Sequence, residues 1–324
     1  MKLSVIICCY NSQSRLPDTL DHILKCRIAT GTVVEVILVD NCCTDNTVSL
    51  ANSIWANSEI ILKTVSEKRP GLIFARQRGI QAASGEILIF VDDDNWLGAH
   101  YFEQLVSMFE NMPTVGIIGG LGTATADTPL PSWFPTYQNY YAVSHASCQS
   151  KMLNTVVGAG MAVRVRVLED IKAAGFESQL VGRSATKLSS GEDSELCYQA
   201  RLLNWRVYFC AELQFEHYLP SERLKDEYLK RLLFGVCMSS APIDVYRYLL
   251  RHNSSIVVYF KCLSKMSKRA LKLFFSKLKT NFYSENEMII LHAHYESWQA
   301  VKFVDLWRRI KKYNISLRPS IRER

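Results

Sequence analysis

The chain has 324 residues, 48% hydrophobic and 21% charged, so it has ordinary globular composition and enough length for about two domains. Its net charge of +7 at pH 7 suits an acidic partner without identifying one. The ten cysteines show no CxxC pair or zinc-type spacing, and neither a secretory signal nor an apolar run of about 20 residues is present, so we expect reduced thiols in a cytoplasmic protein that is soluble or peripheral.

Strand and helix patterns alternate over the first 120 residues. The expected strands cover residues 3–9, 33–39, 59–65, 87–91 and 115–118, and the expected helices cover 14–24, 45–55, 71–83 and 100–110. Short joints connect them, which predicts a mostly parallel sheet covered by helices.

The pattern becomes irregular between residues 121 and 150, where prolines and aromatic residues predict a long functional loop. Beyond it we expect strands at 156–163 and 206–210, helices at 166–174 and 192–203, and a polar loop at 182–191. From residue 222 to the C-terminus the sequence is helical, aromatic and basic.

Residues 261–279 carry seven Lys or Arg and no acid. Helical spacing places a set of apolar residues on one face: Leu263, Met266, Ala270, Phe274 and Leu278. Such a helix either lies on an anionic membrane surface or packs on the rest of the protein with its lysines solvated.

The most informative stretch is the apolar run 87–91, which leads directly into Asp92, Asp93 and Asp94. A strand buried on both faces would place these acids at the carboxyl edge of the sheet, where open α/β folds bind ligands. Like charges this close repel unless a cation relieves them, and carboxylates favour Mg²⁺ or Mn²⁺. The alternative is an acidic surface turn.

The loop after the first strand, residues 9–14, contains no glycine. A dinucleotide fold or a P-loop needs glycines there, so we expect neither a dehydrogenase nor a P-loop NTPase. Polar groups follow three strands and would meet in one crevice, suited to a base, a ribose and metal-bound phosphates: Tyr10-Asn11, Asp40-Asn41 and Asp92-Asp93-Asp94.

Taken together, these segments resemble the inverting glycosyltransferases of family 2, which have the GT-A fold. The matching pieces are residues 5–11, 36–41, 75–80, 85–94 and 191–196, in the family's order and spacing. The resemblance covers about residues 2–220. The loop around Trp133 and the tract 217–220 resemble the corresponding segments in family members that act in bacterial surface-polysaccharide assembly.

The resemblance implies a role for each matching residue. Asp94 would bind Mn²⁺ or Mg²⁺, with His217 as a further ligand, although a lone histidine is more often a packed or surface residue. The implied nucleotide- and donor-binding residues are Cys8, Tyr10, Asn11, Asp40, Asn41, Arg76, Asp92 and Asp93. The chain departs from the family pattern at Cys8, Cys43 and Gln77. These departures affect the expected contacts to the donor base and not the expected fold.

Glu192 and Asp193 open a predicted helix after Gly191, a position where acids commonly cap or favour the helix dipole. By the resemblance, Asp193 is instead the general base, which deprotonates an acceptor hydroxyl during a single inverting displacement. Trp133, Gly160 and Glu192 would lie on the acceptor side.

The resulting prediction is a metal-dependent enzyme that moves a sugar from a nucleotide-sugar donor, UDP-linked, to a glycan or lipid-linked acceptor at the inner membrane surface. We expect no nucleic-acid partner. Residues 1–220 would form the GT-A domain, with a nucleotide-binding half (1–120) and an acceptor half (121–220), followed by a helical region at 221–324. The alternatives are a sugar-nucleotide nucleotidyltransferase and a non-catalytic nucleotide-sugar or membrane-binding scaffold.

Overall fold

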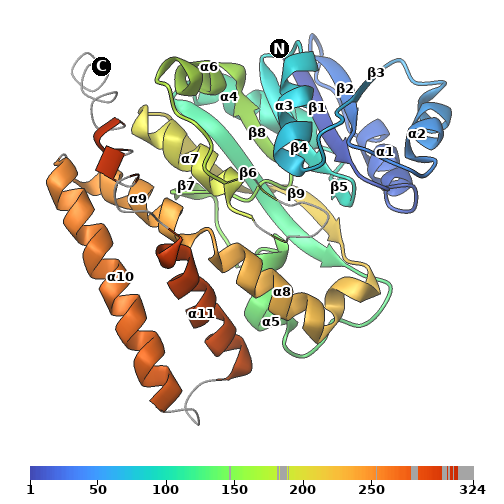
Figure 1. Cartoon of the computed structure of the whole chain (residues 1–324). Helices are drawn as coiled ribbons and strands as arrows, with labels where there is room; N and C mark the ends of the chain where they lie inside the picture. Colours follow the sequence, from blue (N-terminus) through green and yellow to red (C-terminus); the bar gives the residue numbers. More distant parts are fainter. Residues whose placement is uncertain are drawn as a thin grey trace. The chain divides into compact units, whose positions relative to one another are not determined.

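The computed structural model describes residues 1–145, 147–180, 182, 188, 190–252, 254–278, 284–300, 305, 307, 308 and 310–312, with backbone alone at 275, 277 and 278 (Figure 1). The chain divides into two compact units. The first comprises Met1–Glu169 and Trp205–Leu224, and the second comprises Asp170–Asn204 and Lys225–Arg324. The predicted boundary after residue 220 therefore lies near one of these divisions, but residues 170–204 group with the helical C-terminal region. Most of the predicted loop 182–191 lies outside the described residues.

In the described part of the first unit, nine strands form one sheet, in the order β3-β2-β1-β4-β8-β6-β9-β5, with β7 paired to β9. The strands are β1 Lys2–Cys9, β2 Val33–Asp40, β3 Ile61–Ser66, β4 Ile87–Asp92, β5 Asn95–Leu97, β6 Val115–Thr125, β7 Lys151–Leu153, β8 Met161–Arg164 and β9 Arg206–Tyr218. Strands β1 to β4 are mutually parallel, and β8 joins β4 antiparallel. The predicted α/β fold class is confirmed.

Helices cover both faces of the parallel strands. They are α1 Leu16–Leu24, α2 Thr47–Trp55, α3 Leu72–Ala82 and α4 Tyr101–Asn111. Val5 and Ile7 of β1 belong to a buried core that includes Leu20 of α1. On the other face α3 lies directly on β1, since a Cβ at Gly79 would be 2.4 Å from Cγ2 of Ile6. The five apolar residues of β4 are buried on both faces, as the unbroken hydrophobic run predicts.

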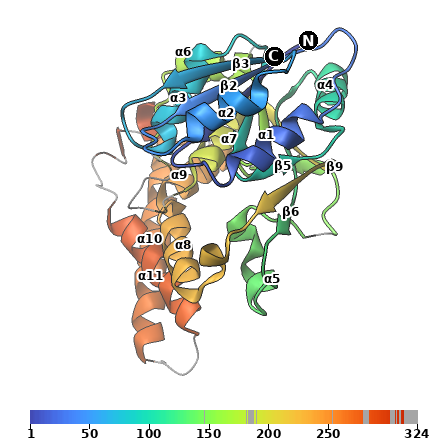
Figure 2. The ribbon, with the colours of Figure 1, turned by 90° about the vertical axis from the view of Figure 1, so that its right-hand side faces the viewer.

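Strands β6 and β9 run side by side and are much longer than the sequence pattern predicts (Figure 2). Glycines 119, 120 and 122 resemble a strand end, but here they lie inside β6. The register shifts between Gly120 and Leu121, and a Cβ at Gly120 would be 2.1 Å from the carbonyl oxygen of Leu213, so the irregularity requires glycine. The expectation that the chain is irregular from residue 121 is therefore wrong up to Thr125. Short helices follow at α5 Phe134–Tyr137 and η1 Gln138–Tyr141.

The predicted helical C-terminal region is confirmed, and it belongs to the second unit. The helices in the described part of this unit are α7 Glu192–Leu202, α8 Asp226–Cys237, α9 Ser240–Arg251, α10 Ser255–Leu278 and α11 Glu285–Gln299, while α6 Val165–Ala173 begins in the first unit and ends in the second. The Ser297 hydroxyl of α11 donates to the Met238 carbonyl at 2.6 Å and accepts from the Ala241 amide at 3.0 Å, which ties α11 to the link between α8 and α9. Within the described residues, every helix is too short or too polar to cross a membrane.

Candidate active site

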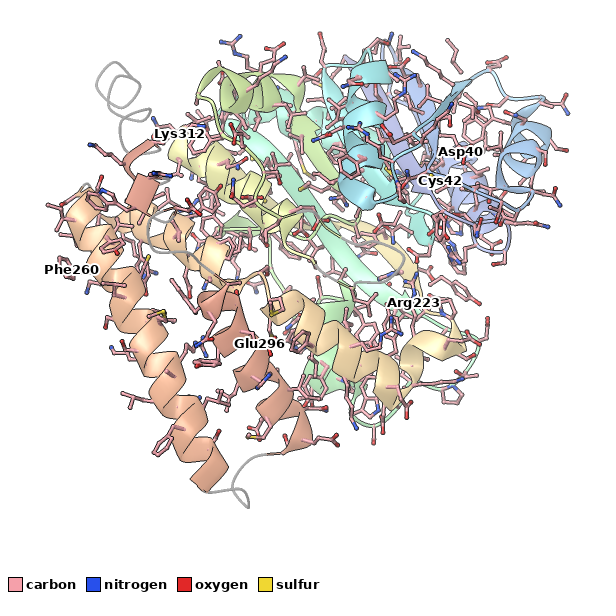
Figure 3. All side chains as sticks on the ribbon, viewed as in Figure 1. Asp40, Cys42, Arg223, Phe260, Glu296 and Lys312 are labelled. Atoms are coloured by element: carbon pink, nitrogen blue, oxygen red, sulfur yellow. The ribbon has the colours of Figure 1, made fainter. Side chains whose placement is uncertain are left out.

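The carboxyl ends of β1, β2 and β4 meet at one edge of the sheet, as predicted. Cys8 of β1 is in register with Asp92 of β4, and Cys9 is in register with Asp40 of β2 (Asp40 is labelled in Figure 3). Acidic side chains that are 52 residues apart in the sequence (40 and 92) thus flank the end of the same central strand. Burial raises the pKa of the Cys8 thiol to about 12, so this cysteine remains a neutral, small side chain.

The turn after β1 presents Tyr10, whose side chain is half exposed, and then Asn11 at φ 49°. Asparagine tolerates this left-handed conformation better than most residues. The side-chain oxygen of Asn11 accepts a hydrogen bond from the Thr44 backbone amide at 2.8 Å. The backbone amide of Asn11 donates to Sγ of Cys43 at 3.4 Å. Cys43 thus joins the ends of β1 and β2.

The side chains of Asp40 and Asn41, at the end of β2, form hydrogen bonds with the backbone of neighbouring loops. The Asp40 carboxylate accepts from the Cys43 amide at 2.9 Å. The buried Asn41 side chain donates to the carbonyls of Glu67 and Arg69 at 3.0 and 2.7 Å and accepts from the Gly71 amide at 2.9 Å. Asn41 therefore fixes the loop before α3, and its contact with a nucleoside stays a prediction.

Each of the three aspartates at the end of β4 and directly after it faces an arginine. Asp92 is the most accessible of them, and its carboxylate lies 4.0 Å from Nη2 of Arg76, whose guanidinium also lies over the Phe90 ring. Asp93 forms a 2.6 Å ion pair with Arg15 at the start of α1. Burial and the neighbouring charge of Asp94 raise the pKa of Asp93, and Arg15 offsets part of that increase.

Asp94 is 2% exposed, and its carboxylate lies 2.8 Å from Nη1 of Arg223 and 3.4 Å from Nε2 of His217. Burial alone would raise the pKa of Asp94, but Arg223 and then His217 hold it well below its usual range. The Asn95 side chain donates to Asp94 at 3.2 Å and accepts from the Asp92 amide at 3.0 Å, which fixes the turn. The repulsion expected within the acidic triplet is therefore relieved by arginines.

The ring of His217 is held by a backbone carbonyl. Its Nδ1 lies 2.6 Å from the Tyr141 carbonyl oxygen, which can only accept, so this geometry assigns the proton to Nδ1. The other ring nitrogen, Nε2, lies 3.4 Å from the Asp94 carboxylate and 3.4 Å from Nη1 of Arg223. An imidazole whose other nitrogen donates to a carbonyl is a common arrangement in metal sites.

A divalent ion fits these donors only in part. Asp94 and His217 together offer an oxygen and a nitrogen ligand, a set that Mn²⁺ accepts. Among the described residues, no cluster of three or more His, Cys, Asp or Glu side chains is arranged to hold a metal. A bound ion would therefore take its remaining ligands from water or from a substrate, as Mg²⁺ and Mn²⁺ often do.

Tyr141, which sequence reasoning missed, supports both groups that face Asp94. Its carbonyl holds His217, and its hydroxyl donates to the Arg223 carbonyl at 2.9 Å. The predicted acceptor-side residue Trp133 stacks on the Tyr141 ring, 6.2 Å between centroids. Gly160 has φ +65°, and its carbonyl accepts a hydrogen bond from the buried Tyr101 hydroxyl. The aromatic richness of residues 133–141 was the available signal for Tyr141.

Asp193 belongs to the second unit, in the first turn of α7, where its carboxylate accepts from the Ser194 amide at 2.6 Å. Gly191 before the helix has φ 114° and touches Ser239 so closely that a Cβ would be 2.7 Å from it. Glu192 approaches Gly182, where a Cβ would be 3.1 Å from the carboxyl carbon. Glycine at both positions lets the chain pass closely before the helix.

Glu195, which the sequence did not single out, fixes the chain that leads into this helix. It is 1% exposed and accepts hydrogen bonds from the Ser178 hydroxyl, the Gln179 and Leu180 amides and the Tyr246 hydroxyl, at 2.9 to 3.1 Å. Burial raises the pKa of Glu195, and these hydrogen bonds offset part of the increase.

The family model described as glycosyltransferase like family 2 matches residues 2–237. The chain belongs to this family. A putative teichuronic acid biosynthesis glycosyltransferase of Bacillus subtilis, TuaG, is 27% identical over 157 residues, 48% of this chain and 59% of that protein. The chain spans less than two thirds of the length of this and other curated relatives that it matches.

Solved structures share the GT-A fold with this chain. S. aureus TarS in complex with UDP-GlcNAc has a TM-score of 0.53 and 17% sequence identity, covering 77% of this chain and 71% of that one. GalNAc-T7 with UDP, GalNAc and Mn²⁺ has a TM-score of 0.52 and 16% identity, covering 73% of this chain and 47% of that one.

We predict that Glu195→Gln destabilises the second unit. The amide group would turn N–H groups toward backbone donors that now bind a carboxylate, leaving buried donors unsatisfied, at a cost of about 2–4 kcal/mol in the free energy of unfolding. Denaturant unfolding measures this. Glu177→Gln is the matched control, since that exposed side chain pairs with Lys312 alone among the described residues and its loss should hardly matter. Equal effects of the two substitutions would contradict the anchoring role.

Proposed function

We propose that the protein is a metal-dependent, inverting glycosyltransferase that uses a nucleotide-diphosphate sugar. The observation that carries the proposal is the edge of the first unit, where Asp92 ends β4, Asp94 follows it, and His217 directs a ring nitrogen at Asp94. It occurs in a chain whose family match extends over residues 2–237.

UDP-linked sugars are the donors we propose, in line with the UDP and UDP-GlcNAc complexes of the structural neighbour TarS. Tyr10 offers an accessible ring for stacking on the base, and Asp40 and Asn41 lie beside it at the next strand end. Asp92 and Arg76 would contact the ribose, sugar or diphosphate. Cys8 would contact the donor from the end of β1, and Asn11 and Asp93 would contribute from the turns after β1 and β4.

Mn²⁺ or Mg²⁺, held by Asp94 and His217, would supply Lewis-acid stabilisation of the leaving diphosphate. The chain's own contribution to the chemistry is Asp193. It accepts the proton of an acceptor hydroxyl while that oxygen forms a bond to the anomeric carbon. The bond from that carbon to the diphosphate breaks on the opposite face, and its electron pair leaves with the nucleotide. One such displacement inverts the anomeric configuration.

Arg223 has a second role in this proposal. Without a metal it neutralises Asp94, so the buried carboxylate never lacks a cation. Asp94 and His217 would hold a divalent ion in place of this guanidinium, and Arg223 would then be available to bind an anionic diphosphate. Arg223 therefore lowers the affinity for free metal and favours the metal together with the nucleotide.

We propose a glycan or lipid-linked acceptor in bacterial surface-polysaccharide synthesis, at the cytoplasmic face of the membrane. The support is family membership and relatives such as the poly(ribitol-phosphate) beta-glucosyltransferase of Bacillus spizizenii, 31% identical over 102 residues. The nucleotidyltransferase alternative is disfavoured, because the cation nearest the glycine-free loop, Arg15, is engaged by Asp93. The intact acids Asp92, Asp94 and Asp193 disfavour a non-catalytic scaffold.

Asp193→Asn should lower the turnover number at least about 100-fold and leave UDP affinity nearly unchanged, because only proton removal is lost. Product formation and calorimetric UDP binding measure the two effects. Asp226→Asn, in the first turn of α8, is the matched control for loss of an acid at a helix start. Substantial turnover by Asp193→Asn, or an equal loss in the control, would refute the assignment of the base.

Arg223→Gln should lower thermal stability in EDTA and make Mn²⁺ strongly stabilising, because Asp94 then lacks its resident cation and the metal has no competitor. Thermal unfolding with and without Mn²⁺ measures this. Arg15→Gln is the control, since it uncovers Asp93, which no histidine faces among the described residues. If Mn²⁺ stabilises both variants equally, Arg223 does not compete for the metal position.

A further inference from the structure

Helix α10 of the second unit exposes a row of large apolar side chains to solvent. Ile256, Phe260, Leu271 and Phe274 are between 56% and 63% exposed, and we call them the α10 stripe. They are separated by 4, 11 and 3 residues, spacings that return to the same face of a helix. Figure 3 shows Phe260 on the side of α10 away from α11.

The stripe is distinct from the face with which α10 packs in its own unit. That packing face consists of Val258, Cys262, Leu273 and Ser276, all of which are buried. The face predicted from the sequence was different again: Leu263, Met266 and Ala270 are half buried, Phe274 belongs to the stripe, and the side chain of Leu278 lies outside the described residues. The membrane and packing interpretations of this helix therefore apply to two different faces.

Basic side chains border the stripe. Lys261, Lys268 and Lys272 are exposed and lie between the stripe and the packing face, and the sequence of α10 contains no acidic residue. Lysine side chains can lay their apolar stems along such a surface while keeping the ammonium group in a polar layer. The face therefore combines apolar insertion with positive charge.

We propose that the α10 stripe and its three lysines bind an anionic lipid surface. The stripe runs straight for about 27 Å along one helix, which matches a planar interface. The helix is already folded by its packing within the second unit, so binding to lipid requires little additional ordering of the chain. A second copy of the chain is a poorer partner, because a symmetric pairing would bring lysine rows together without acids on α10 to compensate.

Lipid binding by the α10 stripe rests on the proposed function, which already places the protein at a membrane surface. It specifies the docking face, and it specifies negatively charged headgroups as the recognised chemistry. Vesicle binding is measured without donor or acceptor, so a failed membrane test leaves the transfer chemistry untouched, and a failed transfer test leaves the membrane test valid.

The experiment is sedimentation of the full chain with vesicles of phosphatidylcholine, alone or mixed with phosphatidylglycerol. The chain should bind the mixed vesicles, and added salt should weaken the binding. The double variant Phe260→Ser with Phe274→Ser should bind at least about tenfold more weakly, because each ring loses apolar area to insert. Lys268→Gln with Lys272→Gln should weaken binding about 10- to 30-fold.

Two controls match these variants. Ile61→Ser with Leu130→Ser removes exposed apolar side chains from the first unit, and Lys25→Gln with Lys172→Gln removes two exposed lysines elsewhere. Both controls should bind like the unmodified chain. Equal loss in controls and variants, absence of sedimentation with either vesicle, or a dimer in light scattering that the Phe260 and Phe274 substitutions dissociate would each overturn the proposal.

Discussion

The burial of the Asp94 carboxylate is the constraint on which the candidate site depends. A charge that is 2% exposed needs a permanent cation, and the chain supplies Arg223 at 2.8 Å, with Nε2 of His217 beside it at 3.4 Å. Both partners depend on Tyr141, which binds one through its carbonyl and the other through its hydroxyl. The length of β9 follows from the same need, since only a strand that reaches Tyr218 brings His217 beside the turn after β4. In the proposed function, the same carboxylate that requires a cation for stability would exchange an arginine for a metal.

The sequence predicts those parts of the site that depend on residues close together in the chain. The apolar run before Asp92 indicates a buried strand, and the polar residues after each strand meet at one edge because the strands are parallel. The pairing of Asp93 with Arg15, 78 residues away, and of Asp94 with Arg223 has no local signature. The extension of β6 was missed because glycines that normally end a strand are required here by a close approach to Leu213. On α10, apolar residues occupy more than one face, and periodicity alone does not tell which of them packs.

The two units contribute different parts of the proposed activity. The first contains the strand ends, the three aspartate–arginine pairs and His217. The second contains Asp193 on α7 and the α10 stripe, and its buried Glu195 fixes the segment that precedes α7. The acid proposed to take a proton and the surface proposed to bind lipid therefore belong to one helical unit, while the residues proposed to hold the donor belong to the sheet.

The central claim is that Asp94 and His217 hold a divalent ion together with a nucleotide diphosphate. Electron paramagnetic resonance of Mn²⁺ tests it most directly, because the ion loses its free six-line signal when it is bound. The account predicts that the chain removes this signal much more effectively with UDP present than without it, and that Asp94→Asn abolishes the removal. UDP binding that is equally tight in EDTA and in Mn²⁺, with no change in the Mn²⁺ signal, would contradict it.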